Sequence, residues 1–464
     1  QLYLDDPAPE IRIAGAGIVG VETADGNVQA TQTWAKLLDM MTNDPSLEVR
    51  AAVIEALGYD SDNVPSLLHQ LAVEKNSDLK VALLAALSPR QSPSIVQVAL
   101  PLLKDQSLRV AQAAADLIAA AGQALRQPNE KNLASQCENA LMRQFTGRST
   151  GPDAEALRES VVRALGELGD MGLEGLFQKL AYDQAESNGV RAMAIMALGN
   201  LASQNWQVAN VYAPFVDPSQ YPAELRLAAA HAMAMAKTTA FVNDMVDKIN
   251  LHPDPDVEVR DAIWETVQTW FPLMSLDDLS NLADRLKNEN DSPHEAEVLR
   301  ALSQRLITSN APGAQADAAA RLETLAYLEL QNLNRPDLAA QHFNQACAIY
   351  ENLGQGLPPS PFKGEADALL ALGPPYDQAV QYAIQVLTNP KLQGIEEDVM
   401  GEYAQVADNW SQPDNNRKRL QDAVTLVDAL EKAGLPKKLP ATLNYIWSEQ
   451  LDQARANAKQ YLAQ

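Results

Sequence analysis

Apolar residues recur at helical spacing through most of the chain. The segment from Leu47 to Gly58 places apolar side chains at every third or fourth position, namely Val49, Ala52, Val53, Ala56 and Leu57. This spacing puts them on one face of an amphipathic helix. Several of them are small, so a second helix can approach this face closely. The pattern therefore predicts a helix that packs against a partner.

The same helix pattern returns along the chain. The sequence NDPSLEVRAAVIEALG at residues 43–58 is repeated as HPDPDVEVRDAIWETV at residues 252–267. Weaker copies are centred on Arg12, Lys80, Arg109, Arg158, Arg191, Arg226 and Arg300. The copies recur about every 36 residues, within the range of repeat proteins.

A second amphipathic segment precedes most copies, as at residues 33–41, 66–74 and 98–105. Each repeat is thus expected to be a helical hairpin. A single hairpin cannot bury its own apolar faces, so stacked neighbours must do so and form a solenoid. Aspartate or asparagine before proline is expected to cap the second helix, with proline in its first turn. The turn-rich residues 145–153 and the proline- and aromatic-rich residues 206–222 are expected to project as loops.

The repeats resemble HEAT repeats, in particular the bacterial type that shares the pattern D-P-x-x-x-V-R-x-A-A-x-x-A-L-G with phycobilin-lyase-like proteins. The resemblance covers about two thirds of the chain and predicts a HEAT-repeat solenoid over residues 1–307. It implies a right-handed superhelix with the second helices on its concave face. The pairs Asp44/Arg50 and Asp254/Arg260 resemble the internal polar ladder of that family, which implies a structural role for these residues.

The last third of the chain is helical but follows another pattern. Residues 308–315 (TSNAPGAQ) are typical of a linker, and residues 316–464 are expected to form a second domain. Ala339, Phe343 and Ala346 have the spacing of the second helix of a tetratricopeptide (TPR) repeat, which this region resembles, with a degenerate second match at Ala379 and Ala383. Three further helices are expected over residues 399–410, 419–433 and 441–462. The predicted fold class is all-α: a HEAT-type α-α superhelix followed by TPR-like helical repeats.

Composition and charge narrow the possible partners. The chain has 36 basic and 60 acidic residues and a net charge of −24, so phosphate backbones and anionic lipids would repel it. We therefore expect neither nucleic-acid binding nor direct membrane insertion, and no apolar run approaches the length of a membrane span. Only QLYL precedes the first turn, which suggests that the chain is processed or truncated. It is expected to be soluble, and either cytoplasmic or, if an upstream segment has been removed, exported to the periplasm.

The sequence offers little support for chemistry. Gly15, Gly17 and Gly20 form a GxGxxG motif typical of dinucleotide-binding turns, but a turn and a helix start precede it in place of a strand. Gly20 also falls where Gly58 falls in the next repeat, so a repeat helix is the favoured interpretation. The two cysteines and five histidines lack metal-ligand spacing, and no nucleophile motif is present. We expect no cofactor, no metal and no catalysis.

A candidate partner-binding surface lies near the eighth repeat. Residues 251–300 hold 12 acidic and 4 basic residues, beside two tryptophans. Aromatic and acidic side chains together favour a protein partner with a basic surface. The candidate residues are Asp254, Asp256, Glu258, Trp264 and Trp270. In the alternative interpretation the rings fill the core and the acids only solubilise the chain.

Three functional hypotheses follow. The first is a non-catalytic protein-protein interaction scaffold that uses an extended helical-repeat surface. The second, implied by the resemblance alone, is a lyase- or chaperone-like enzyme of the phycobilin-lyase group. The third is a structural subunit of a larger or exported assembly.

Overall fold

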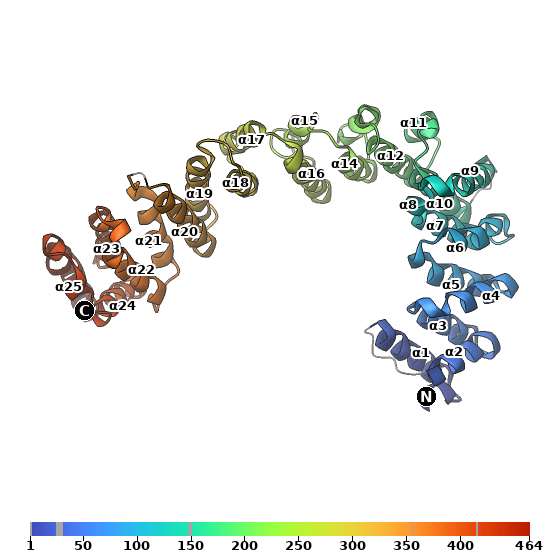
Figure 1. Ribbon diagram of the computed structural model, residues 1–464, viewed down its shortest axis with the longest axis horizontal. Coiled ribbons are helices and arrows are strands. Elements are labelled where there is room, and N and C mark those ends of the chain that lie inside the picture. The colour runs from blue at the N-terminus through green and yellow to red at the C-terminus, as the bar shows by residue number, and fades with distance from the viewer. Residues whose placement is uncertain (1, 25–30, 147–150, 355, 414–415) are drawn as a thin grey trace. The chain divides into compact units, whose positions relative to one another are not determined.

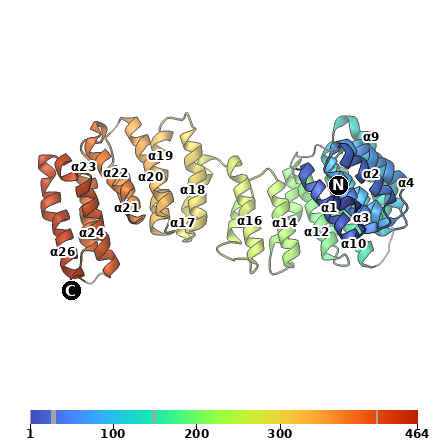
Figure 2. The same cartoon turned by 90° about the horizontal axis from the view of Figure 1, so that it is seen from below.

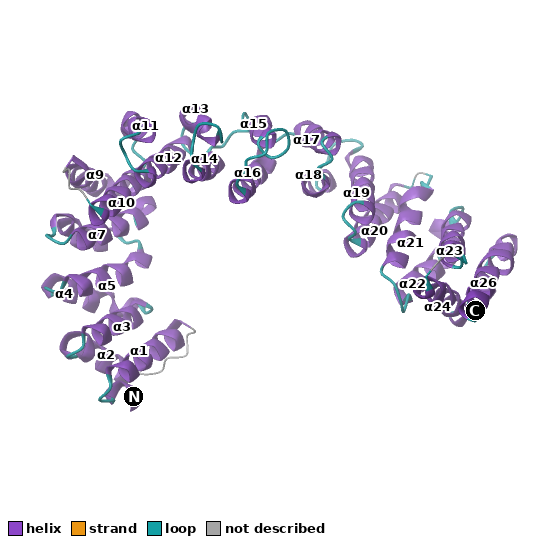
Figure 3. Ribbon diagram, turned by 180° about the vertical axis from the view of Figure 1, so that it is seen from behind, coloured by secondary structure: helices purple, strands orange, loops and turns teal. Residues whose placement is uncertain are grey.

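The computed structural model describes residues 2–24, 31–146, 151–354, 356–413 and 416–464. Every regular element within these ranges is helical, and none is a strand (Figure 3). The chain divides into two compact units, unit 1 (Gln1–Trp270) and unit 2 (Phe271–Gln464). The predicted all-α repeat fold is confirmed.

Unit 1 is a stack of helical hairpins whose first and second helices lie on opposite sides (Figures 1 and 3). Each second helix packs on the next one along the chain. The second helices are α1 (Pro9–Ala24), α3 (Leu47–Gly58), α5 (Ser77–Leu87), α7 (Leu108–Ala120), α10 (Pro152–Leu168), α12 (Asn188–Ala202), α14 (Ala223–Met235) and α16 (Val257–Trp270). The helices of the other side are α2 (Thr31–Asn43), α4 (Val64–Val73), α6 (Pro93–Ala99), α9 (Lys131–Thr146), α11 (Glu174–Tyr182), α13 (Ala209–Tyr212) and α15 (Val242–Asp247), and the short α8 (Gly122–Leu125) follows α7 and packs on α10.

The repeat copies found in the sequence coincide with these second helices. The eight copies from Arg12 to Arg260 each lie in one of them, and the copy at Arg300 lies in a helix of unit 2. Gly15 and Gly17 belong to α1, which confirms that the GxGxxG motif is part of a repeat helix.

Local capping explains where several second helices begin. Ser46 is the N-cap of α3 and accepts a hydrogen bond from the backbone N–H of Val49. Asn76 and Ser187 cap α5 and α12 in the same way. The expectation that the aspartate before proline caps the helix is wrong for α3, because Asp44 instead accepts from the backbone N–H of Ser46 and so shapes the turn before the cap.

Successive second helices meet along a seam of glycine and alanine. A Cβ atom added to Gly58 would lie 2.9 Å from the Cβ of Ala86, and one added to Gly166 would lie 2.5 Å from the Cβ of Ala197. Gly20 faces Ala56 and Gly199 faces Ala232 at similarly short range. Each contact joins the end of one second helix to the next. The glycine and alanine of the A-x-x-A-L-G pattern therefore set how closely neighbouring repeats pack.

One expected loop is instead part of the helical layer. Residues 206–222 were expected to project, but residues 206–216 form two 3₁₀ turns and α13, and only residues 217–222 are a loop. Tyr212 and Phe215 are fully buried there, and the Tyr212 hydroxyl donates to the carbonyl of Ala232 at 2.9 Å. Burial of these two rings holds the segment against α14. The other expected loop, residues 145–153, lies partly outside the described residues.

Unit 2 is also a series of helices packed in succession (Figure 2). Its helices are α17 (Leu276–Asn288), α18 (Ser292–Ile307), α19 (Ala314–Gln331), α20 (Pro336–Leu353), α21 (Pro359–Ala371), α22 (Asp377–Thr388), α23 (Glu396–Trp410), α24 (Arg417–Lys432), α25 (Leu435–Lys438) and α26 (Asp452–Leu462). A π-helical turn, η12 (Ile446–Leu451), precedes α26, so the single helix expected over residues 441–462 is interrupted.

The compact units do not divide at the expected linker. Residues 308–313 form a short connection between α18 and α19, which pack on each other within unit 2. Ala339, Phe343 and Ala346 are fully buried in α20, as the TPR-like spacing requires. A change of repeat type near residue 310 stays a prediction, because the compact units describe packing and not repeat class.

The seam predicts opposite effects for two glycine-to-alanine changes. Gly166→Ala should lower the free energy of unfolding of unit 1 by about 1–3 kcal/mol, because the new methyl group overpacks against Ala197. Gly17→Ala should raise it by about 0.5–1 kcal/mol, since nothing lies within 4 Å of the added Cβ and alanine favours the helix. Hydrogen exchange of second-helix amides measures both. Equal effects of the two changes would contradict the seam.

Candidate interaction surface

The two tryptophans of the predicted partner-binding surface lie in the core. Trp264 is 6% exposed and Trp270 is 1% exposed. The indole Nε1 of Trp270 donates to the carbonyl of Ala236 at 3.0 Å. Both rings are buried within unit 1, so they do not present a surface to a partner. The alternative interpretation of these two residues is the one that the structure supports.

The three acidic candidates differ in how deeply they are buried. Asp254 is fully buried, Asp256 is partly exposed and Glu258 is exposed. The carboxylate of Asp254 accepts two hydrogen bonds of 2.7 Å from the guanidinium of Arg226 in the preceding second helix. Asp254 is therefore bound inside unit 1, whereas a partner-binding role of Asp256 and Glu258 stays a prediction.

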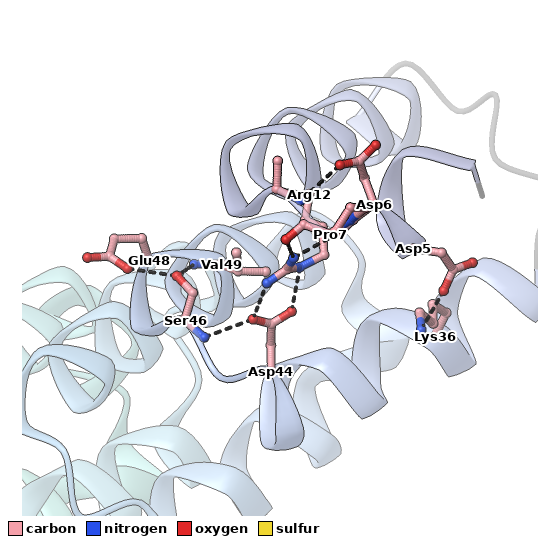
Figure 4. Close-up of polar contacts among 10 residues, drawn as sticks. Asp5, Asp6, Pro7, Arg12, Lys36, Asp44, Ser46, Glu48 and Val49 are labelled. Atoms are coloured by element: carbon pink, nitrogen blue, oxygen red, sulfur yellow. Dashed lines mark hydrogen bonds and ion pairs between the residues drawn. The ribbon is translucent and has the colours of Figure 1, made fainter.

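Figure 4 shows the same arrangement in the first repeats. Arg12 of α1 donates to both carboxylate oxygens of Asp44, at 2.8 and 2.9 Å, and to the backbone carbonyls of Asp6 and Pro7. Asp44 also accepts from the N–H of Ser46 at 2.9 Å. One arginine thus connects the turn of its own repeat to the turn of the next repeat.

The pairs recur between successive repeats. They are Arg12–Asp44, Arg50–Glu74, Lys80–Asp105, Arg158–Glu186 and Arg226–Asp254 in unit 1, and Arg300–Glu329 in unit 2. In all of them except Arg300–Glu329 both side chains are at most 20% exposed. We call this set the ladder.

Three of the predicted ladder residues, Asp44, Arg50 and Asp254, take part in these pairs, but Asp44 and Arg50 do not pair with each other. Asp44 faces the preceding repeat and Arg50 faces the following one, so they lie on opposite flanks of the same repeat. Arg260 does approach Asp254, but it donates to the backbone carbonyl and not to the carboxylate. The ladder joins repeats to one another and does not brace single repeats.

The ladder changes at Arg109. This arginine pairs with Asp78 of the preceding second helix, and both side chains are more than half exposed. The longer interval that follows inserts α8 and α9 before α10. The regular partner position is thus displaced, which makes Arg109–Asp78 a solvated counterpart of the buried pairs.

The ladder partners lower the pKa values of several ladder acids. Burial alone would raise the pKa of Asp44, but the hydrogen bonds from Arg12 and from the N–H of Ser46 outweigh it and hold the pKa below its usual value. The pKa values of Glu74 and Asp105 are lowered for the same reasons, with burial again opposing the hydrogen bonds. These acids therefore stabilise unit 1 in their ionised form.

An apolar groove lies on the open face of the second helices, between α3 and α5. It has a volume of about 690 Å³. Its wall is made mostly of small side chains, with Tyr59, which is 50% exposed, at one edge. The lining residues are Ala51, Ala52, Glu55, Gly58, Tyr59, Ala82, Ala85, Ala86, Pro89 and Arg90. We call it the alanine groove.

Arg90 closes one end of the alanine groove. Its guanidinium donates to the carbonyl of Gly58 at 2.7 Å. Its buried Nε atom has no hydrogen-bond partner among the described residues. Buried polar atoms are nearly always paired, so the Nε–H of Arg90 is an exception in the wall of the groove.

A second, more polar groove of about 480 Å³ continues along α7 and α10. It contains the exposed ion pair between Arg163 and Asp116, together with Glu167. Ser88 and Gln91, next to the Pro89 and Arg90 of the alanine groove, line its near end. The open face of α3, α5, α7 and α10 thus offers an apolar site followed by a polar one.

Neither groove was predicted from the sequence. The pattern A-A-x-x-A-L-G indicated helix packing, but its first two alanines, Ala51 and Ala52, remain partly exposed and line the alanine groove. Among the described residues no group of His, Cys, Asp and Glu has the arrangement of a metal site. No described helix is long and apolar enough to cross a membrane.

Comparisons with known proteins give one sequence match. The vitellogenin TPR domain family matches residues 134–268, which lie in unit 1. No curated protein matches the chain. The fold and the ladder by themselves define the chain as a helical-repeat protein.

Several solved structures are similar at low identity. Kap121p bound to Ste12p is 12% identical with a TM-score of 0.37, over 99% of this chain and 48% of Kap121p. Kap95p, in a structure with RanGDP, is 13% identical with a TM-score of 0.45, over 100% of this chain and 69% of Kap95p. An engineered protein is 18% identical with a TM-score of 0.29, over 94% of this chain and all of its own. This chain thus spans about half the length of Kap121p.

The ladder predicts how acid destabilises unit 1. A carboxyl group whose folded pKa is lowered contributes stability above its unfolded pKa of about 4, and this is lost as the pH falls through the folded value. Asp44→Asn should lower the free energy of unfolding at pH 7 by about 2 kcal/mol and flatten its decline below pH 4. The exposed Asp62→Asn should change neither. The free energy of unfolding is measured by chemical unfolding at several pH values, with hydrogen exchange of the α1 and α3 amides as the readout. Parallel plots of this free energy against pH for Asp44→Asn and wild type would contradict the prediction.

Proposed function

We propose that this protein is a protein-binding scaffold whose binding surface is the open face of the second helices in unit 1. The alanine groove is the observation that supports this most directly. It is apolar, concave and large enough for several side chains, and pockets of 300–1,000 Å³ are typical of ligand sites. Exposed apolar concavities of this kind mark interaction sites on protein surfaces.

The groove favours a particular partner, namely an amphipathic helix. α3 and α5 run side by side, and small residues between them allow a third helix to lie close, as in other helix-in-groove complexes. Large apolar side chains would enter the space between Ala51 and Ala85. The carbonyls at a helix C-terminus, or a carboxylate nearby, would accept from Arg90 at the end of the groove.

A basic surface on the same partner is a further part of the proposal. Glu55 borders the alanine groove, and Asp256 and Glu258 extend acidic charge to the last repeat of unit 1. Complementary charge of this kind accelerates association and adds specificity more than affinity. The proposal also includes a role as a structural subunit, since a scaffold that binds one partner in each groove assembles a complex.

The lyase- or chaperone-like alternative stays a prediction. No observation on the described residues favours it over a scaffold. Incubation with a bilin and measurement of an absorbance shift is the direct test of that alternative.

The proposal is tested with a display library of amphipathic helical peptides panned against the full chain. Selected peptides should carry large apolar residues at helical spacing and an acidic residue or the C-terminus at one end. Ala85→Arg places a long charged side chain in the groove at an exposed position, so it should weaken binding at least about tenfold without unfolding the repeat.

The matched control is Ala72→Arg, at an exposed alanine of α4 on the opposite side of unit 1. This variant should bind as wild type does. Binding that Ala85→Arg leaves unchanged would exclude the alanine groove as the site. A library that yields only peptides without apolar periodicity would contradict the helical partner.

A further inference from the structure

Unit 2 contains a carboxyl group buried in its core. Glu365 on α21 is only 4% exposed. Its Oε1 accepts one hydrogen bond, from the Nδ2 of Asn344 on α20 at 3.0 Å. Its Oε2 is buried and has no hydrogen-bond partner among the described residues. An ionised carboxylate with one unsatisfied oxygen in such a place is costly.

Two neighbours of Glu365 can accept a hydrogen bond from its protonated carboxyl group. The Tyr382 hydroxyl on α22 donates its proton to the carbonyl of Phe362 at 3.1 Å, so its oxygen remains able to accept. Cys347 on α20 is 3% exposed, and its thiol is a weak acceptor as well as a weak donor. A proton on Glu365 therefore has acceptors at hand, whereas a negative charge there is opposed by burial and stabilised only by neutral donors.

The charged groups around this core are mostly acidic. Glu351 on α20 repels the charge of Glu365. Asp367, two residues further along α21, faces Glu402 on α23, whose Oε2 lies 3.3 Å from the Nζ of Lys363. Lys363 is thus engaged with Glu402 and not with Glu365. No cation is paired with Glu365 among the described residues.

Further titratable groups pack against α21. Tyr403 on α23 is fully buried and donates to the carbonyl of Ala379. Tyr327 and Glu323 on α19 lie toward Ser360 at the start of α21. None of these groups supplies a positive charge, so the core around α21 binds protons more readily than it holds negative charge.

We propose that Glu365 is a buried proton-binding site that closes the core of unit 2 when protonated and loosens it as the pH rises through neutrality. This inference is independent of the groove in unit 1. The occupant is a single proton, bound between α20, α21 and α22. It makes the local stability of unit 2 dependent on pH in a range that cells and their compartments use.

The direction of the dependence follows from linkage. Burial raises the pKa of Glu365 from 4.5 to about 7, although hydrogen bonds from Asn344, Cys347 and Tyr382 oppose the shift. The folded state then binds the proton more tightly than the unfolded state. The stabilisation is complete below the unfolded pKa and is lost as the pH rises through the folded value. Burial and the nearby Glu402 raise the pKa of Asp367 as well, which acts in the same direction.

The labelling rates of the two cysteines measure local opening in each unit. Both are free and buried, with Cys347 beside Glu365 in unit 2 and Cys137 in unit 1. A disulfide-exchange reagent that reacts at low pH, such as 4,4′-dithiodipyridine, labels each thiol only when its surroundings open. Rates are divided by that of an unstructured cysteine peptide at the same pH. In the wild-type full chain the ratio of Cys347 to Cys137 labelling should rise at least about tenfold from pH 5.5 to pH 8.5.

Glu365→Gln isolates the proton site, because glutamine has the shape of the protonated acid and cannot ionise. In this variant the ratio should rise less than about twofold over the same range. Glu449→Gln, at an exposed acid of η12 that does not act on Glu365 or Cys347, is the matched control and should retain the wild-type rise. A wild-type ratio that does not change with pH overturns the proposal, even if Glu365→Gln fails to fold. The same rise in Glu365→Gln as in wild type also overturns it.

Discussion

The close approach of successive second helices is the constraint on which the rest of unit 1 depends. A glycine at the end of one helix faces an alanine of the next, and the short contacts at Gly58 and Gly166 leave no room for a methyl group. Because the helices are so close, the residues beside the seam must also be small. The alanines that line the groove between α3 and α5 are thus a consequence of packing, and the surface proposed to bind a partner arises from the same pattern that stacks the repeats.

The ladder adds polar contacts between the same neighbouring repeats. Each arginine or lysine reaches from one second helix to an acid that shapes the turn of the next repeat, as Arg12 does with Asp44. Asp44, Glu74, Asp105 and Asp254 are satisfied on both sides, by the cation and by a backbone N–H. Removing one partner of such a buried pair would leave the other charge desolvated and unpaired, which costs more than the pair contributes. This makes each repeat dependent on the next, as expected of a one-dimensional array.

The helices and the repeat period were predictable because their signals are local. The periodicity around Val49 or Val259 and the turn residues before it specify a helix without reference to distant parts of the chain. The ladder residues were recognised but their partners were not, since a spacing of six residues does not reveal that Asp44 and Arg50 lie on opposite flanks. The burial of Trp264 and Trp270 required knowledge of the neighbouring helix.

Two other features depended on packing that the sequence does not display. Residues 206–222 contain prolines typical of loops, yet the burial of Tyr212 and Phe215 makes them part of the helical layer. Glu365 follows a proline-rich stretch, and only the contact of α21 with α20 and α23 places its carboxyl group in a core. An acidic residue among many others gives no sign of its burial.

A double-mutant cycle on Arg226 and Asp254 tests most directly whether repeats depend on their neighbours. Both residues are changed to alanine singly and together in the full chain, and the exchange of α14 and α16 amides gives the local free energies of opening. The account predicts a coupling energy of at least about 2 kcal/mol for this buried pair, and less than about 0.5 kcal/mol for the exposed pair Arg109–Asp78. A coupling energy near zero for Arg226–Asp254 would contradict it.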